Sequence, residues 1–442
     1  MTKLMSMRPS PLTVLAALAA LGLAPAKSQA QHEGHAAPPS DSVRGDRWHL
    51  MVQAIPLVTH AANTVGGESF TEGYLAQAAA MGRAELLSGH LRLDVTLNAE
   101  GTTMRRGELS TGAFGEGFID RRHPHTYLHE VIATGLGRLG PARYSVSAGR
   151  GFAAFGTDDP MMRPVEKYPI NHHLSQILER AIVTGAVRVG PAIVEGSIFG
   201  GEEPTSPSYT PSMSRFGDSW SVRGTVLPLE GLEVQASYAR VASPEHVSGV
   251  GLDQLKRSIS ARFVSSTGNR YVLSEWARTI EHDAVRGLDV FGYETALIEG
   301  AATVGPIGVA ARLEQTERPE EERDTDPFRV PRPASDLAIG GITRWRAATL
   351  ALTFPSPFSG PIRTYPFLEA ARLSTAGKDA RSLFQPRSFY GSRAPWMLSG
   401  GVRIRYGTPH ARMGRYGAAL PAGPTIEALA APGENSKTVH DH

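Results

Sequence analysis

The sequence contains no cysteine, so it has neither a disulfide framework nor an attachment site for the lipid of a lipoprotein. An absence of thiols fits an oxidising compartment. The sequence also lacks a clear excess of either charge, because 45 Lys and Arg residues are balanced by 43 Asp and Glu residues. This balance gives no argument for a nucleic-acid partner and indicates that the charges serve local purposes such as lining and pairing.

The N-terminus has the pattern of an export signal. Two basic residues precede an apolar run over 12–23, and small residues follow as far as Ala30. The run is too short to span a membrane, so we expect a signal peptide over residues 1–30 and then a flexible periplasmic leader over 31–46. No run of about 18 apolar residues follows, so the sequence predicts no transmembrane helix in the mature chain.

Most of the remaining chain alternates between apolar and polar residues with a period of two. Over 91–98, leucine and valine alternate with Arg, Asp, Thr and Asn, and similar patterns recur at 232–238 and 307–314. This period is typical of β-strands rather than helices. The sequence therefore predicts an all-β chain with about sixteen strands between residues 47 and 407.

The connections between these strands alternate between short and long. Short turns are expected at 139–141, 189–191 and 229–231, and long loops at 100–125 and 154–174. A soluble β-sandwich has no reason to gather its long loops at one end, whereas an outer-membrane barrel does. We therefore predict a transmembrane antiparallel β-barrel over 47–407, located in the cell outer membrane with both termini on its periplasmic side. Residues 408–442, rich in Ala, Pro and Gly, are expected to form a flexible periplasmic tail.

One segment, within residues 143–201, resembles a known family. Gly149-Arg150-Gly151-Phe152, Phe155-Gly156, Leu178-Glu179-Arg180 and residues 194–201 are similar to the segment shared by phosphate-selective porins of the O/P superfamily. The resemblance implies a sixteen-stranded outer-membrane porin, and because members are often trimeric, a homotrimer is one expected assembly. The family's phosphate-binding residues have no residue-by-residue match here, so phosphate selectivity is not implied.

The last expected strand carries a more general resemblance. Ser399, Gly401, Ile404 and Tyr406 fit the pattern by which barrel proteins resemble one another at their assembly strand. This similarity implies the barrel assembly machinery and outer-membrane lipids as partners. The chain continues beyond that aromatic residue to His442.

Charged residues on the polar faces of the strands are the candidate pore lining, because a water-filled lumen keeps them solvated. A third long loop of mixed charge is a candidate constriction. The alternatives are Arg–Glu pairs that merely stiffen the wall, and an ordinary surface loop. The lining candidates are Arg92, Asp94, Arg143, Arg223, Glu233, Arg262, Arg312, Glu314, Arg403 and Arg405, and the constriction candidates are Asp158, Asp159, Arg163, Glu166 and Lys167.

No pattern points to catalysis, a cofactor or a structural metal site. Gly217-Asp218-Ser219 has the order of an esterase nucleophile motif, but it opens an expected strand rather than a strand-to-helix elbow. We therefore predict a passive channel for small hydrophilic solutes that is not an enzyme. Because Arg outnumbers acids among the lining candidates, a mild anion preference is expected. The alternatives are a barrel with a blocked lumen that acts as a binding or interaction protein, and an outer-membrane esterase.

Overall fold

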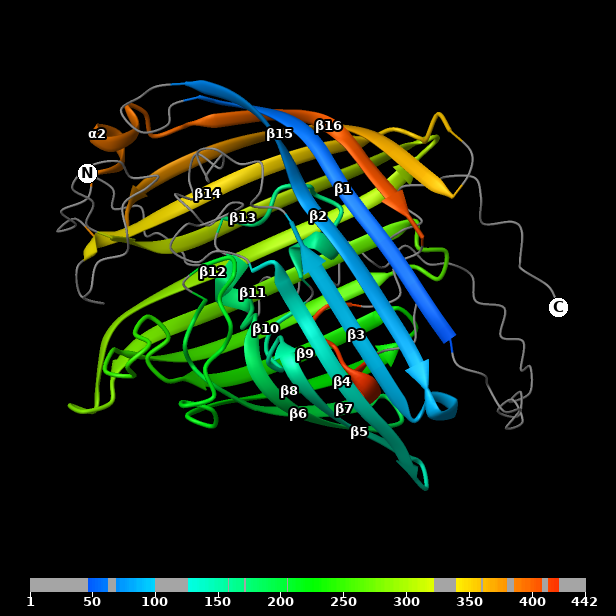
Figure 1. The fold of residues 1–442 in the computed structure, drawn as a ribbon. Coiled ribbons are helices and arrows are strands. Elements are labelled where there is room, and N and C mark those ends of the chain that lie inside the picture. The colour runs from blue at the N-terminus through cyan, green and yellow to red at the C-terminus, as the bar shows by residue number, and fades with distance from the viewer. Residues whose placement is uncertain are drawn as a thin grey trace. The chain divides into compact units, whose positions relative to one another are not determined.

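Sixteen antiparallel strands close into one barrel in the computed structural model (Figure 1). The structure describes residues 47–62, 69–99, 126–157, 159–170, 172–204, 206–321, 339–358, 361–379, 385–407 and 412–420. The strands are β1 (Arg47–Ala62), β2 (Phe70–Leu86), β3 (Leu91–Asn98), β4 (Leu128–Leu139), β5 (Ala142–Gly151), β6 (Arg180–Val189), β7 (Ala192–Phe199), β8 (Ser219–Leu229), β9 (Leu232–Val241), β10 (Asp253–Val264), β11 (Arg270–Asp283), β12 (Leu288–Val304), β13 (Ile307–Glu321), β14 (Ile339–Thr353), β15 (Ile362–Gly377) and β16 (Trp396–Tyr406).

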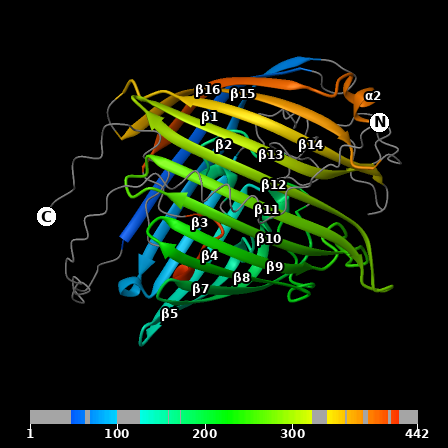
Figure 2. The same ribbon diagram turned by 180° about the vertical axis from the view of Figure 1, so that it is seen from behind.

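Each strand pairs with its neighbours in sequence, and β1 pairs with β16 to close the ring. The closing register places Val52 opposite Tyr406 and Ala62 opposite Trp396. The first strand therefore begins, and the last strand ends, at the same end of the barrel. Figure 2 shows the strands running obliquely around the wall, as closure of a sheet requires. The predicted all-β barrel of sixteen strands is confirmed.

Short and long connections alternate as expected. Turns of two residues join β4 to β5, β6 to β7 and β8 to β9, whereas 28 residues, 152–179, join β5 to β6. We call the two ends of the barrel the short-turn end and the long-loop end. Of the helical elements, α2 (Pro386–Tyr390) and the 3-10 helices Pro160–Met162 and His172–Ser175 lie in long connections, whereas the 3-10 helix Leu87–Gly89 lies in the short one between β2 and β3.

The two faces of the wall have opposite character. Apolar side chains point outward and remain exposed, for example Val194 at 63% and Leu313 at 59%. Charged side chains point inward and are buried, for example Arg223 at 1% and Glu299 at 0%. A soluble barrel would show the reverse, because burying apolar surface is what stabilises a fold in water. Among the described residues, no helix is long and apolar enough to cross a membrane.

Three predicted segments have different outcomes. The signal peptide (1–30) and the leader (31–46) lie outside the described residues. The flexible periplasmic tail (408–442) stays a prediction outside residues 412–420, the part of it that the structure describes. Met413, Tyr416 and Ala419 are buried inside the barrel, where this segment appears in red in Figure 1. The segment lies inside the barrel because of its charge, since two of its arginines form ion pairs with carboxylates of the inner wall.

Candidate functional site

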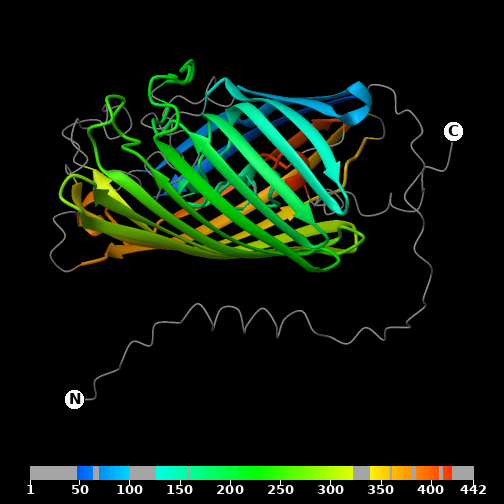
Figure 3. The ribbon, with the colours of Figure 1, turned by 90° about the horizontal axis from the view of Figure 1, so that it is seen from below.

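The lumen of the barrel contains two chain segments. We call Phe152–Glu179, between β5 and β6, the crossing loop, and Arg412–Leu420 the inner C-terminal segment. Figure 3 gives a view of the same fold turned by 90°. Both segments are packed against charged side chains of the wall, and together they form the candidate functional site.

The crossing loop enters the lumen at Gly156. This glycine has a positive φ of +67°, and a Cβ there would lie 1.6 Å from the backbone oxygen of Ser175. Only glycine fits such a close approach. Beside it, the Gly156 N–H donates to Ser237 Oγ over 3.0 Å, and Gln235 Nε2 donates to the Gly156 carbonyl over 2.7 Å. The loop is therefore fixed to β9 at the point where it leaves the wall.

From there the loop reaches strands on the far side of the ring. Arg163 forms an ion pair with Glu275 of β11 at 3.3 Å, and Ile170 N–H donates to Glu314 of β13 at 2.9 Å. Near its tip, Glu166 pairs with Arg403 of β16 at 2.6 Å. Because the loop starts at β5 and contacts β11, β13 and β16, it crosses the lumen rather than covering one mouth.

Backbone groups of the loop tip are held by the wall as well. The N–H of Glu166 donates to Glu369 Oε2 over 2.9 Å. Arg312 Nη2 donates to the carbonyls of Lys167 and Tyr168 over 2.9 and 3.1 Å. Hydrogen bonds to charged partners are the stronger kind, so these contacts fix the path of the loop firmly.

Lys167 is the single lysine in the sequence of the crossing loop. Its ammonium donates to the hydroxyl of Tyr74 over 3.3 Å, and its side chain is almost fully buried. Burial lowers the pKa of Lys167 to about 8, and the nearby Glu369 carboxylate opposes the shift only in part. A lysine inside the lumen is thus close to losing its charge under mildly alkaline conditions.

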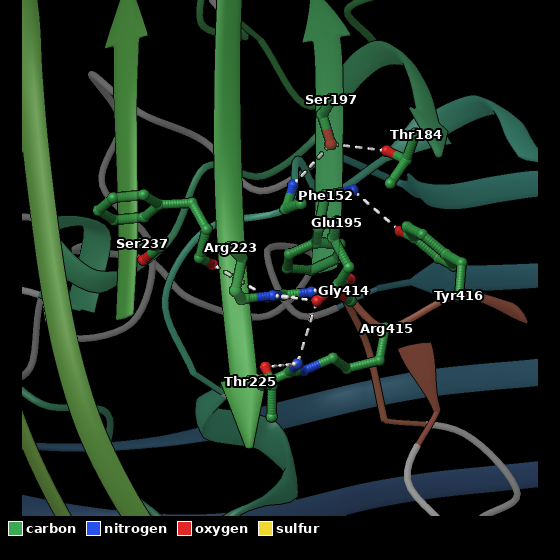
Figure 4. A network of polar contacts seen from close by, with 12 residues as sticks. Phe152, Thr184, Glu195, Ser197, Arg223, Thr225, Ser237, Gly414, Arg415 and Tyr416 are labelled. Carbon is green, nitrogen blue, oxygen red and sulfur yellow. Dashed lines mark hydrogen bonds and ion pairs between the residues drawn. The ribbon is translucent and has the colours of Figure 1, made fainter. Parts of the chain in front are cut away.

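The inner C-terminal segment occupies another part of the lumen, along β4–β9. Arg415 donates through Nη2 to Glu233 over 2.7 Å and through Nη1 to Thr225 over 3.1 Å. Figure 4 shows Arg223, Glu195 and Arg415 in one connected network, with Gly414 beside them. The pair between Arg223 and Glu195 is bidentate, with both nitrogen–oxygen distances at 2.6 Å.

Tyr416 links the two segments to each other. Its hydroxyl donates to Glu130 of β4 over 2.6 Å and accepts from the N–H of Phe152, the first residue of the crossing loop, over 2.9 Å. Burial, together with the charge of Glu130, raises the pKa of Tyr416 well above its usual value, so the phenol stays protonated and can donate. Burial and the neighbouring Arg223 lower the pKa of Arg415 to about 10, which still leaves it charged at neutral pH.

The predicted lining residues point into the lumen, but most of them are paired rather than facing open water. The pairs within the wall are Arg83–Asp94 at 2.7 Å, Arg92–Glu85 at 3.1 Å, and Arg312 with Glu299 at 3.2 Å and with Glu314 at 3.3 Å. Arg405 donates to Gln53 over 2.9 Å, and Arg262 lies over the Tyr271 ring at 5.8 Å. The alternative of Arg–Glu pairs that stiffen the wall therefore describes much of this set.

Arg143 differs from the rest of the predicted set. Its side chain is exposed, and the strand register places it opposite Arg138 of β4 and Arg188 of β6. Arg188 donates to the carbonyls of Gly190 and Leu420. Three arginines therefore share one row of the inner face at the short-turn end.

The predicted constriction residues lie together in the crossing loop, except that Asp158 falls outside the described residues. Asp159 caps the short 3-10 helix by accepting from Met161 N–H over 2.8 Å, and its other oxygen accepts from Gln176 Nε2 over 3.3 Å. Arg163, Glu166 and Lys167 contact the wall, as described above.

Several residues of the site were not identified from the sequence. Glu195, Glu275 and Glu369 are inward-facing acids whose alternation with apolar neighbours could have revealed them. With them included, the buried charged residues of the described chain hold at least as many acids as bases. Arg412 and Arg415 gave no signal, because their segment has neither periodicity nor a motif.

A small cavity, with about 20 Å³ of space for water-sized molecules, lies beside the crossing loop and the start of β10. Polar side chains line much of it, including Gln176, Arg180, Gln254 and Lys256. Lys256 lies with its ammonium 5.9 Å from the centre of the Phe155 ring. The space next to the loop, towards the long-loop end, is therefore that of about one water molecule.

The serine of the esterase-like motif has a structural role. Ser219 is fully buried, its hydroxyl donates to Asp218 over 2.6 Å, and it accepts from the N–H of Ala242 over 2.9 Å. Asp218 in turn pairs with Arg215 at 2.8 Å. A nucleophile also needs an accessible oxygen, and the oxygen of Ser219 is buried and bonded on both sides.

Comparisons with known proteins identify no family for this chain. No family model matches the chain, and no curated protein matches it. Similar solved structures include an anion-selective porin from Comamonas acidovorans, with 12% identity over 82% of this chain and 100% of that one, at a TM-score of 0.49. Pseudomonas putida OprB has 10% identity over 82% and 94%, at 0.48. The outer membrane channel DcaP of Acinetobacter baumannii has 9% identity over 82% and 98%, at 0.46.

The class that the chain's own geometry defines is a sixteen-stranded antiparallel barrel with an apolar outer face and a charged, partly filled lumen. This assignment stands on the strand register and on the burial pattern.

Proposed function

We propose that this chain is an outer-membrane channel for the passive diffusion of small hydrophilic solutes. The observation that carries the proposal is the inversion of the wall, with exposed apolar side chains outside and buried charges inside. An apolar band of this kind is stable in hydrocarbon, and a sixteen-stranded barrel is wide enough for an aqueous lumen. The same inversion supports a location in the outer membrane, with lipid around the wall.

The path and the charges of the crossing loop suit it to act as a constriction of the lumen. It runs through the lumen and carries Arg163, Glu166 and Lys167, so a passing solute would meet charges of both signs. A narrow aqueous pass with fixed charges selects by size and by charge. The resemblance to the phosphate-selective porins of the O/P superfamily remains part of this proposal. So do a homotrimer as the assembly and the barrel assembly machinery as a partner.

The sign of the charge selectivity is the finest part of the proposal. A mild anion preference is favoured by the row of the exposed Arg138 and Arg143 and the half-buried Arg188 at the short-turn end. Against it stand the inward acids that pair with the other arginines. Reversal potentials in a KCl gradient decide the sign. The double variant Arg92→Glu with Arg312→Glu is expected to shift selectivity towards cations, and no shift would mean that these residues do not line the path.

A second candidate is favoured by one observation, namely that two segments occupy the lumen. In this candidate the lumen is blocked and the barrel acts as a binding or interaction protein. Liposome swelling separates the two functions. Vesicles that contain the folded protein are expected to swell in isotonic solutions of small sugars and amino acids. Intact barrels that leave the vesicles impermeable to all of them would favour the interaction protein.

A further inference from the structure

The inner C-terminal segment lies in a groove of the wall that recognises both its charge and its backbone. Arg412 Nη1 donates to Glu233 Oε2 over 2.6 Å, and Arg415 Nη2 donates to Glu233 Oε1 over 2.7 Å. Arg415 also contacts Glu195 at 3.2 Å and donates to Gln235. One carboxylate thus receives two guanidinium groups, which is an arrangement suited to a basic peptide.

The wall also binds the backbone of the segment. Arg223 Nη2 donates to the Gly414 carbonyl over 2.8 Å, and Ser145 Oγ accepts from the Ala418 N–H over 2.9 Å. Further along, Arg188 donates to the Leu420 carbonyl over 3.4 Å. Hydrogen bonds to main-chain groups at three points hold the segment, which includes the 3-10 helix Gly417–Ala419, in one register.

Close packing sets the size of residue that the groove accepts. Gly417 has a φ of +53°, and a Cβ built on it would lie 2.3 Å from Ser145 Oγ and 2.9 Å from a methyl carbon of Thr134. Ala418 and Ala419 follow, and Ala419 is fully buried against Ala186 and Ile193. The groove therefore fits a sequence in which small residues follow the basic pair.

The wall keeps part of its charge pairing without the segment. Glu195 is already bound in a bidentate pair by Arg223, so losing Arg415 does not leave it as an isolated buried charge. Glu233, by contrast, would lose its ion pairs with both Arg412 and Arg415. Breaking a buried pair is costly mainly when it leaves a charge without a partner, and Glu233 still has Arg262 of β10 opposite it.

We propose that the inner wall formed by β4–β9 is a binding site for a basic peptide, and that Arg412–Leu420 is its tethered occupant, a plug that can leave the lumen. Tethering gives the segment a high effective concentration at the groove, so it occupies the site most of the time. The effect of the plug on permeation rests on the proposed channel function, whereas the binding itself does not.

The absence of cysteine makes a clean reporter possible in the full chain. Ala418→Cys places the only thiol of the protein inside the groove, where a bulky maleimide reacts only after the segment leaves. Adding Arg412→Gln and Arg415→Gln should speed labelling by about tenfold or more, because each change removes charge-assisted hydrogen bonds. A matched control removes two arginines elsewhere, with Arg286→Gln and Arg346→Gln, and should leave the labelling rate unchanged.

Competition tests the peptide site directly. An excess of a free peptide with the sequence of residues 412–420 should displace the tethered segment and speed labelling of the thiol in the Ala418→Cys reporter. A peptide with both arginines replaced by Gln should not. Labelling at the same rate in the reporter and its Arg412→Gln, Arg415→Gln form, or equal competition by both peptides, would overturn the proposal.

A disulfide between Ser145→Cys and Ala418→Cys tests the effect on permeation. The contact of 2.9 Å between Ala418 N and Ser145 Oγ brings the two positions within reach of each other. In planar bilayers the oxidised channel should conduct less than the same channel after reduction, and equal conductance would overturn the plug. If no form conducts while labelling and competition behave as expected, the peptide site stands and the channel function fails.

Discussion

The ion pair between Glu166 and Arg403 fastens the tip of the crossing loop to β16, and its removal should loosen the loop measurably. The two side chains meet at 2.6 Å, and their exposed fractions are 3% and 11%. Two unit charges about 4 Å apart attract by about 4 kcal/mol at the effective dielectric constant that suits such sites. Desolvation offsets part of this attraction, so a net contribution of about 2 kcal/mol is expected.

A loss of about 2 kcal/mol raises the population of the detached loop about 30-fold. Hydrogen exchange reads this population, because the N–H groups of Glu166 and Ile170 are bonded to Glu369 and Glu314 only while the loop is in place. Arg403→Met and Glu166→Gln should each speed exchange of these amides by about that factor. The double variant should exchange little faster than either single variant, because both remove the same pair.

Arg92→Met is the matched control, since Arg92 pairs with Glu85 within the wall and not with the loop. It should leave exchange in the loop unchanged. Exchange of the Glu166 and Ile170 amides at the wild-type rate in Arg403→Met would refute the claim that this pair fastens the loop.

The other predictions concern pH and the outer face. Burial holds the pKa of Lys167 at about 8, so raising the pH from about 7 to 9 should shift the KCl reversal potential towards cation selectivity, and the shift should vanish in Lys167→Met. Since the unfolded chain binds this proton up to a pKa of 10.5, the contribution of Lys167 to the free energy of unfolding should rise between pH 8 and 10.5. A fall over that window would contradict the shift. Leu368→Arg, at a 51% exposed position in the middle of β15, should destabilise the barrel folded in lipid vesicles by about 2–4 kcal/mol. Val304→Arg, at the end of β12, should cost about 0–1 kcal/mol, and equal costs at both positions would argue against a lipid-facing band.

Much of the fold could be predicted because strand alternation and loop lengths are local properties of the sequence. Residues 91–98 alternate strictly, and the structure uses that alternation to separate the outer face from the lumen. The inward direction of Arg312 and Arg403 follows from the same period. Short turns such as Gly140-Pro141 could be predicted from their turn-forming residues.

The site could be predicted less well from the sequence, because its contacts join residues that are far apart in the chain. Glu166 meets Arg403 across 237 positions, and no local pattern pairs them. The packing of the inner C-terminal segment inside the barrel could not be predicted for a related reason, since a Gly- and Ala-rich composition is typical of mobile tails. Its order comes from Arg412 and Arg415, whose partner Glu233 lies on β9.

Single-channel recording of the purified full-length protein in planar bilayers tests the central claim most directly. The account predicts discrete conductance steps in KCl, with a reversal potential in a salt gradient that changes between pH 7 and 9 as Lys167 loses its proton. A folded, membrane-inserted barrel that gives no conductance steps, even after the disulfide between Ser145→Cys and Ala418→Cys is formed and then reduced, would contradict a channel.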